Sequence, residues 1–299
     1  MNKRIWMGLA AIVLLAAAPN AQNPPPAGVV VAVDRDPPTW RALLLRLKEA
    51  LPSTRFVEVD ATGRAVAAKG PRIRDLVGRT GFLALGAGAE TTLKKMSRGR
   101  LVAVRAGFRP GADRTEPGVT RLWLAPPAEA VGEALSLFLP QVQALGVMGD
   151  IPEIPLPKGV KLVRVARKGE KHERALLETW APLLDALLLP DLEALAPRAE
   201  EVAAAARKQG VPVVTTAGWL CRSGVTLGVL PDLDLWSLRI CAALGARGYA
   251  GRAPLPPARI LLVVDAPFFG RRKPSLTALL RVDRVLGRPA WSRRVPAYP

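Results

Sequence analysis

The sequence predicts an α/β protein made of two doubly wound parallel-sheet lobes with a cleft between them. Short apolar runs alternate with segments that have the spacing of amphipathic helices, a pattern typical of parallel strands covered by helices. The alternation starts again after about residue 128 and continues for a similar length. The chain has 299 residues, of which 49% are hydrophobic and 23% charged, so it can bury two globular cores.

The first residues have the layout of a secretory signal peptide. A short basic region, Asn2–Arg4, precedes the apolar run Ile5–Ala18, and small residues continue to Ala21. We expect residues 1–21 to be the signal peptide, residues 22–27 a proline-rich linker, and the mature protein to be periplasmic. The apolar run is shorter than the roughly twenty residues of a membrane span. An uncleaved N-terminal anchor is the alternative.

The first round of alternation predicts five strands and two helices. The helix Trp40–Leu51 is amphipathic, with leucines spaced three or four residues apart, and a second helix spans Glu90–Met96. The strands are expected at Val29–Val33, Arg55–Val59, Gly81–Leu85, Leu101–Val104 and Val119–Leu124. Helices separate most of these strands, which favours a parallel sheet covered on both faces.

The second round repeats this order, and a basic tail follows from Gly287. The expected helices are Ala128–Leu139, Glu170–Thr179, Pro197–Gln209, Leu233–Leu244 and Leu276–Val285. The expected strands are Ala144–Met148, Lys161–Val165, Leu183–Leu189, Val211–Val214, Val225–Leu230 and Ile260–Val264. Ligands of such sheets bind beyond the carboxyl ends of the strands, so the cleft between two lobes is the expected place for a small molecule.

Charge and motif content argue against several function classes. The formal net charge is +18, but the basic residues are spread along the chain without a nucleic-acid-binding motif, which indicates a solvated basic surface and no nucleic acid partner. A single histidine, His172, and the lack of a nucleophile elbow or metal-ligand spacing predict no enzyme, no metal and no cofactor. Cys221 and Cys241 are compatible with a disulfide or with two buried thiols.

Several segments together resemble one family of ABC transporter substrate-binding proteins, the family associated with tryptophan, tyrosine and related solutes. The resemblance covers most of the chain from Gly81 onward, and it depends on the order and spacing of the segments. They are Phe138–Gly149, Leu183–Leu195, Val211–Asp232, Leu233–Gly251, and the C-terminal Pro274-Ser275-Leu276, Leu279-Leu280-Arg281 and Asp283.

This resemblance implies the type I periplasmic-binding-protein fold, in which the chain crosses between the lobes three times. It implies a first lobe of residues 28–139 plus about 232–252. The second lobe takes residues 140–231 plus about 253–286, before a basic tail at 287–299.

The resemblance also implies where a ligand binds, namely in the loops that follow the strands. Backbone N–H groups at helix N-termini attract anions there, and carboxylates pair with ammonium groups. The matching positions are Asp34, Gly86, Gly88, Glu90, Phe108, Asp191, Thr215, Thr216, Trp219 and Asp232, together with Gly107 and Gly149-Asp150. Structural roles are the alternative: capping for Asp191, a tight turn for the glycines and packing for Trp219.

The first-lobe loops depart from the family pattern. Ala87-Gly88 stands where the family commonly has a hydroxyl residue and a proline, and Gly107-Phe108 stands in place of Asp-Pro. We expect a monomeric periplasmic component of an ABC importer that captures a small organic solute, such as an amino acid or aromatic compound, and delivers it to an inner-membrane ABC permease. The alternative is an envelope interaction protein that keeps the fold without a ligand and uses its basic surface.

Overall fold

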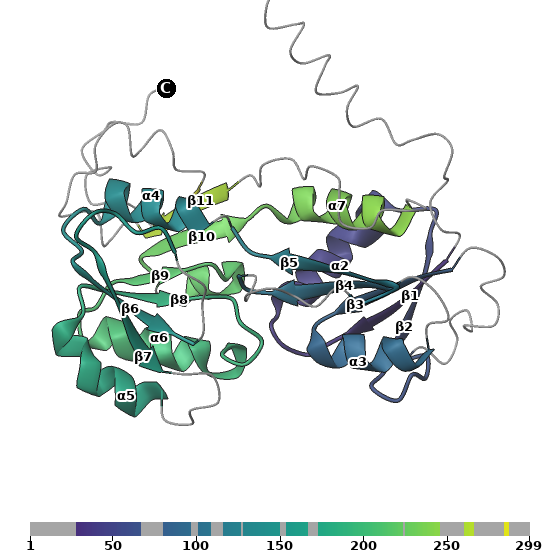
Figure 1. The fold of residues 1–299 in the computed structure, drawn as a ribbon, viewed down its shortest axis with the longest axis horizontal. Helices are drawn as coiled ribbons and strands as arrows, with labels where there is room; N and C mark the ends of the chain where they lie inside the picture. The colour runs from purple at the N-terminus through teal and green to yellow at the C-terminus, as the bar shows by residue number, and fades with distance from the viewer. Residues whose placement is uncertain are drawn as a thin grey trace, which may run out of the picture.

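A computed structural model describes residues 28–66, 80–96, 101–108, 116–126, 128–149, 154–166, 173–223, 225–245, 260–265 and 284–286. The expected signal peptide, linker and basic tail lie outside these ranges, as do Asp150 and His172. Two sheets lie side by side, each with helices on its faces (Figure 1). None of the helices in the described ranges has the length and apolar character that a membrane-crossing segment needs.

The first sheet is parallel throughout, in the order β2-β1-β3-β4-β5. Its strands are β1 (Gly28–Val33), β2 (Arg55–Val59), β3 (Thr80–Leu85), β4 (Leu101–Ala106) and β5 (Val119–Leu124). The helices that connect its strands along the chain are α2 (Thr39–Ala50) and α3 (Ala87–Met96). The inner strand β1 is apolar and buried almost throughout because it is covered on both faces.

The second sheet is larger, in the order β12-β11-β10-β9-β8-β6-β7. Its strands are β6 (Ala144–Met148), β7 (Lys161–Ala166), β8 (Ala186–Leu189), β9 (Val213–Thr215), β10 (Leu227–Pro231), β11 (Ile260–Asp265) and β12 (Arg284–Leu286). The helices that follow the first lobe in sequence are α4 (Ala128–Phe138), α5 (Glu173–Trp180), α6 (Ala199–Lys208) and α7 (Leu233–Gly245). Short 3-10 helices are η2 (Ala181–Leu183), η3 (Ala196–Arg198) and η4 (Gly218–Arg222).

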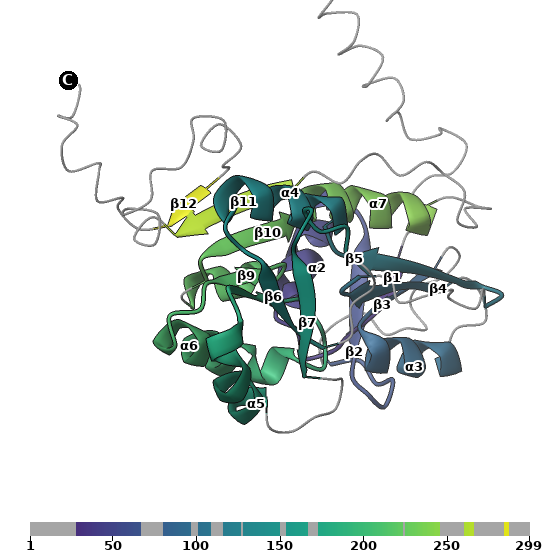
Figure 2. The same cartoon turned by 60° about the vertical axis from the view of Figure 1, so that its left-hand side comes forward.

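The chain crosses between the lobes three times. After β5, helix α4 packs on the second sheet, where its apolar face shares a core with β6, β8 and β10 (Figure 2). After β10, helix α7 returns to the first lobe and packs beside α2, burying Trp236 and Ile240. The strand β11 then lies in the second sheet again. The two doubly wound lobes and this connectivity are those of the type I periplasmic-binding-protein fold.

Two features of this arrangement differ from the expectation. Helix α4 was expected in the first lobe, whose boundary was placed at residue 139, but its buried face contacts the second sheet. Strand β11 runs antiparallel to β10. The reason is the intervening helix α7, since a chain that leaves the second lobe along β10 and comes back from the first lobe enters the sheet in the opposite direction.

Prolines account for two displaced strand starts. The strand expected at Leu183–Leu189 begins at Ala186, after the 3-10 turn that contains Pro182. The strand expected at Val211–Val214 begins at Val213, since Pro212 has no N–H to donate. The expected helix Leu276–Val285 falls mainly outside the described residues, and its last two positions belong to strand β12 instead. Cys221 and Cys241 are both free thiols, so they do not form a disulfide with each other.

Candidate functional site

Each lobe has a topological switch point, the place where the strand order reverses and where α/β sheets bind ligands. In the first sheet it lies between β1 and β3, so the loops that begin at Asp34 and Gly86 flank it. In the second sheet it lies between β6 and β8, flanked by Gly149 and by the loop that contains Asp191. Of the residues that the sequence predicts for the site, these four loops carry Asp34, Gly86, Gly149 and Asp191.

The switch point of the first lobe is filled by the Asp34 carboxylate. Its two oxygens accept the backbone N–H groups of Gly88 at 2.8 Å and Ala89 at 2.7 Å, which caps the start of α3. Gly86 has φ +111°, and a Cβ there would overlap Asp34. A Cβ on Gly88 would lie 2.9 Å from Asp34 Oδ1. The two glycines thus make room for this carboxylate.

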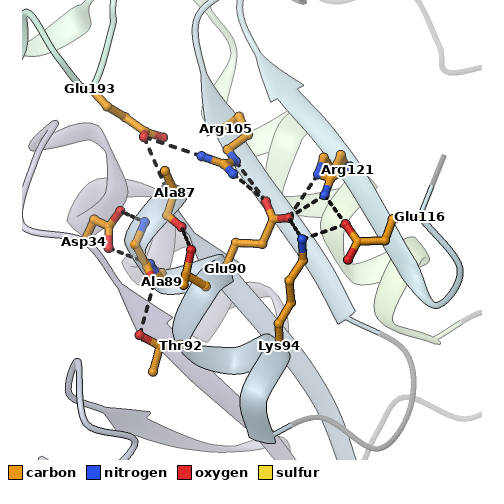
Figure 3. Close-up of polar contacts among 12 residues, drawn as sticks. Asp34, Ala87, Ala89, Glu90, Thr92, Lys94, Arg105, Glu116, Arg121 and Glu193 are labelled. Carbon is orange, nitrogen blue, oxygen red and sulfur yellow. Dashed lines mark hydrogen bonds and ion pairs between the residues drawn. The ribbon is translucent and has the colours of Figure 1, made fainter. Parts of the chain in front are cut away.

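Glu90, one turn further along α3, is the centre of a buried charge network (Figure 3). Its carboxylate is 2% exposed and pairs with Arg105 at 2.8 Å, Arg121 at 2.7 Å and Lys94 at 2.9 Å. Glu116 also pairs with Lys94 and Arg121. Burial alone raises the pKa of Glu90, but the hydrogen bonds from Arg121 and Lys94 and the charge of Arg105 outweigh it and lower the pKa to about 2.

The switch point of the second lobe holds a fully buried carboxylate, Asp191. Its Oδ1 accepts the Trp219 indole N–H at 3.2 Å, and its backbone N–H donates to Thr216 Oγ1 at 2.9 Å. Thr215 Oγ1 donates to the Leu189 carbonyl at 2.7 Å. Three predicted site residues, Asp191, Thr216 and Trp219, are therefore joined in one hydrogen-bonded group.

Burial raises the pKa of Asp191 to about 6. The hydrogen bonds from Thr39 and Trp219 oppose this rise, and the negative charge of Glu193 adds to it. Burial likewise raises the pKa of Glu193, against the positive charge of Arg105 and the Ala87 N–H.

The two switch points contact one another through the loop after β8. Asp191 Oδ2 accepts the Thr39 hydroxyl at 2.8 Å, from the first residue of α2. Glu193 Oε2 accepts the Ala87 N–H at 3.2 Å and lies 3.8 Å from Arg105 Nη1 (Figure 3). Loops of both lobes therefore converge on one polar junction.

The remaining predicted residues lie elsewhere. Phe108 follows β4 but is buried in the core that α4 forms on the second sheet. Asp232 accepts the backbone N–H groups of Asp234 and Leu235 at the start of α7, next to a lobe crossing. Both have structural roles in the described contacts.

Sequence reasoning missed Thr39, Arg105, Leu192 and Glu193. Two of them carried a signal: Arg105 is a charged residue inside an otherwise apolar strand, and Glu193 follows Asp191 in a loop at the carboxyl end of a strand. Thr39 and Leu192 carried none. Within the described residues, no group of three or more His, Cys, Asp or Glu side chains is arranged to hold a metal ion. The junction offers carboxylates, hydroxyls, an indole and one guanidinium, which suit binding of a polar organic molecule.

The strand orders and the lobe crossings define a two-lobed protein with the type I periplasmic-binding-protein fold. No family model matches the chain, and no curated protein matches it in sequence. A conserved domain protein from Vibrio cholerae is similar in structure, with a TM-score of 0.63 at 18% identity, over 87% of this chain and 100% of that one.

Two further solved structures are similar. One is an ABC domain in complex with L-Trp from Streptococcus pneumoniae, with a TM-score of 0.60 at 14% identity, over 87% of this chain and 99% of that one. The other is the ligand-free, open structure of a substrate-binding protein with adhesive properties from Clostridium difficile. Its TM-score is 0.57 at 14% identity, over 88% of this chain and 100% of that one. At these identities the likeness establishes the fold.

Proposed function

We propose that this protein is a periplasmic solute-binding component of an ABC importer. It captures a small organic solute, such as an amino acid or an aromatic compound, between its lobes and passes it to an inner-membrane permease. The main support is the convergence of the two switch points, joined by the Thr39–Asp191 and Ala87–Glu193 contacts. The similar structures support the same role, since one is bound to L-Trp and another is a substrate-binding protein.

Within this proposal, the solute contacts residues of both switch points. Asp34 and Glu193 present carboxylates to an ammonium group, and Trp219 presents an indole to a ring. Thr216 positions Asp191 through its hydroxyl. The remaining predicted positions, including Glu90 and Asp232, act through the loops that they hold in place.

A thermal-shift screen of the chain from Gln22 onward tests the proposal. Amino acids, aromatic acids, nucleosides, sugars and polyamines are the compounds to include. A solute at one hundred times its dissociation constant adds about 2.7 kcal/mol of stability, which shifts the melting temperature by several degrees.

A hit is then measured by calorimetry on Asp34→Ala and on a matched control, Asp60→Ala. Asp60 also accepts local hydrogen bonds, from Thr62 and Arg64, but these contacts lie within the exposed turn that follows β2 in the first lobe. We expect Asp34→Ala alone to weaken binding. Equal affinities of the two variants would remove Asp34 from the site, and an absence of hits would count against solute capture.

One observation favours a second function, an envelope interaction protein without a ligand. The carboxylates of the junction already accept hydrogen bonds from the protein itself, and Ala87-Gly88 adds no side-chain donor. With a formal net charge of +18, such a protein binds anionic surfaces. Its test is binding to vesicles that contain anionic phospholipid, which should weaken sharply between low and physiological salt.

A further inference from the structure

Three consecutive residues after β8 each reach from the second lobe to the first. Asp191 accepts the hydroxyl of Thr39, 152 residues away in sequence. Leu192 lies against the first-lobe loop after β4, since a Cβ on Gly107 would come within 2.5 Å of Leu192 Cδ2. Glu193 accepts the N–H of Ala87. We call the segment Asp191–Glu193 the strap.

The strap is anchored at both ends by groups that are themselves fixed. On the second-lobe side, Asp191 is held by Trp219 and Thr216. On the first-lobe side, Arg105 lies 3.8 Å from Glu193 and is paired with the buried Glu90. Strap closure therefore orders few additional side chains, which keeps its entropic cost low.

We infer that the strap is a built-in closing device, which holds the lobes together when no solute is bound and which an incoming solute must displace from Ala87 and Arg105. The inference rests on the proposed function only in placing the solute at this junction. Closure itself requires no solute.

The chemistry of the strap suits a reversible contact. Its end contacts are polar, so water can replace each partner when the lobes separate. Glu193 Oε1 is buried and accepts no short hydrogen bond from the described residues, with the Ala106 N–H nearby, so opening would hydrate an atom that closure leaves poorly satisfied. By contrast, Leu192 packs near Gly107 of the first lobe, which gives the closed form an apolar contact between the lobes.

Amide hydrogen exchange measured by NMR without any solute tests the strap. In Glu193→Ala, the Ala87 N–H loses its acceptor, and its exchange should become about tenfold faster, as expected for one lost hydrogen bond to a charged group. The amides of Gly88 and Ala89 are internal controls, because their acceptor is Asp34 of the same lobe. Their exchange should stay unchanged. Small-angle scattering of the same sample should give a larger radius of gyration.

Two further variants complete the design. Glu200→Ala is the matched control, since Glu200 lies in the second lobe and accepts a hydrogen bond from Ser223 there. It should leave both readouts at wild-type values. Glu193→Gln keeps the size of the side chain and should give an intermediate effect if Glu193→Ala folds poorly.

Three results would each overturn the strap. One is unchanged exchange at Ala87. Another is an equal rise in the exchange rates of the Gly88 and Ala89 amides, which would indicate fraying of α3. The last is an unchanged radius of gyration, which would indicate a contact that does not hold the lobes. A solute screen without hits affects none of these readouts, so failure of the proposed function stays distinguishable.

Discussion

The substitution Glu90→Gln tests whether the buried charge network stabilises the first lobe. The wild-type carboxylate is 2% exposed and has a pKa lowered from 4.5 to about 2, which corresponds to about 3 kcal/mol of favourable interaction in the ionised form. The substituted amide keeps the size of the side chain but leaves Arg105, Arg121 and Lys94 without their shared anion. We expect a loss of about 3 kcal/mol and a melting temperature lower by roughly 6–12 °C.

The pH dependence gives a second, independent readout of the same network. A carboxyl whose pKa is lower in the folded state contributes its full stability above the unfolded pKa and loses it as the pH falls. For Glu90, the loss should occur between about pH 4.5 and pH 2. The wild-type protein should therefore lose about 3 kcal/mol more than Glu90→Gln across this range.

Urea unfolding at several pH values, followed by circular dichroism, measures both effects. The matched control is Glu116→Gln, which removes a carboxylate from the same network at a position that is 43% exposed. Surface pairs of this kind contribute about 1 kcal/mol or less. A loss below about 1 kcal/mol for Glu90→Gln, or acid curves that coincide with the wild type, would refute the reasoning.

Three other substitutions address the junction between the lobes. The pKa of Asp191 is raised in the folded state, so the wild-type protein should lose stability as the pH rises from about 4 to 6, and Asp191→Asn should remove this loss. Urea unfolding at several pH values measures it, and a loss that persists in Asp191→Asn would show that Asp191 is not its source. Gly107→Ala forces a side chain into φ +97° and against Leu192, so calorimetry should show a loss of about 2 kcal/mol, and an unchanged melting temperature would contradict the contact. Thr215→Val leaves the Ala217 N–H without its acceptor and should cost about 1–3 kcal/mol in urea unfolding, whereas the matched change at the exposed Thr91, Thr91→Val, should cost far less.

The elements of the fold were readable from the sequence because their signals are local. Strand β1 is an uninterrupted apolar run, and α6 has Glu200 and Glu201 in its first turn and Arg207 in its last, as a helix dipole favours. The side of the molecule on which a helix packs is not a local property. The apolar face of α4 fits either sheet, so the residues alone do not assign it; the family resemblance implied the first lobe, but the helix packs on the second sheet.

The candidate site was only partly predictable, for the same reason. The sequence indicated the loops after the parallel strands, and some of these loops flank the switch points in the structure. What each carboxylate binds there depends on partners far along the chain. Glu90 pairs with Arg105 and Arg121, which are 15 and 31 residues away, and Glu193 bonds to Ala87 across 106 residues. No pattern within a single segment indicates such pairs.

The hydrogen bonds that the two lobes already make to each other at the junction have a quantitative consequence for solute capture. If the strap keeps the lobes closed in about 99% of molecules, and only the open form admits a solute, the apparent dissociation constant is about one hundred times the intrinsic one. Glu193→Ala should then bind a solute up to about one hundred times more tightly, unless that solute needs the carboxylate itself. An ammonium compound would lose affinity in this variant, whereas a carboxylate would gain it because the Ala87 N–H loses its acceptor and Arg105, still paired with Glu90, loses the nearby charge of Glu193. The sign of the change therefore reports the charge of the group that binds beside Arg105.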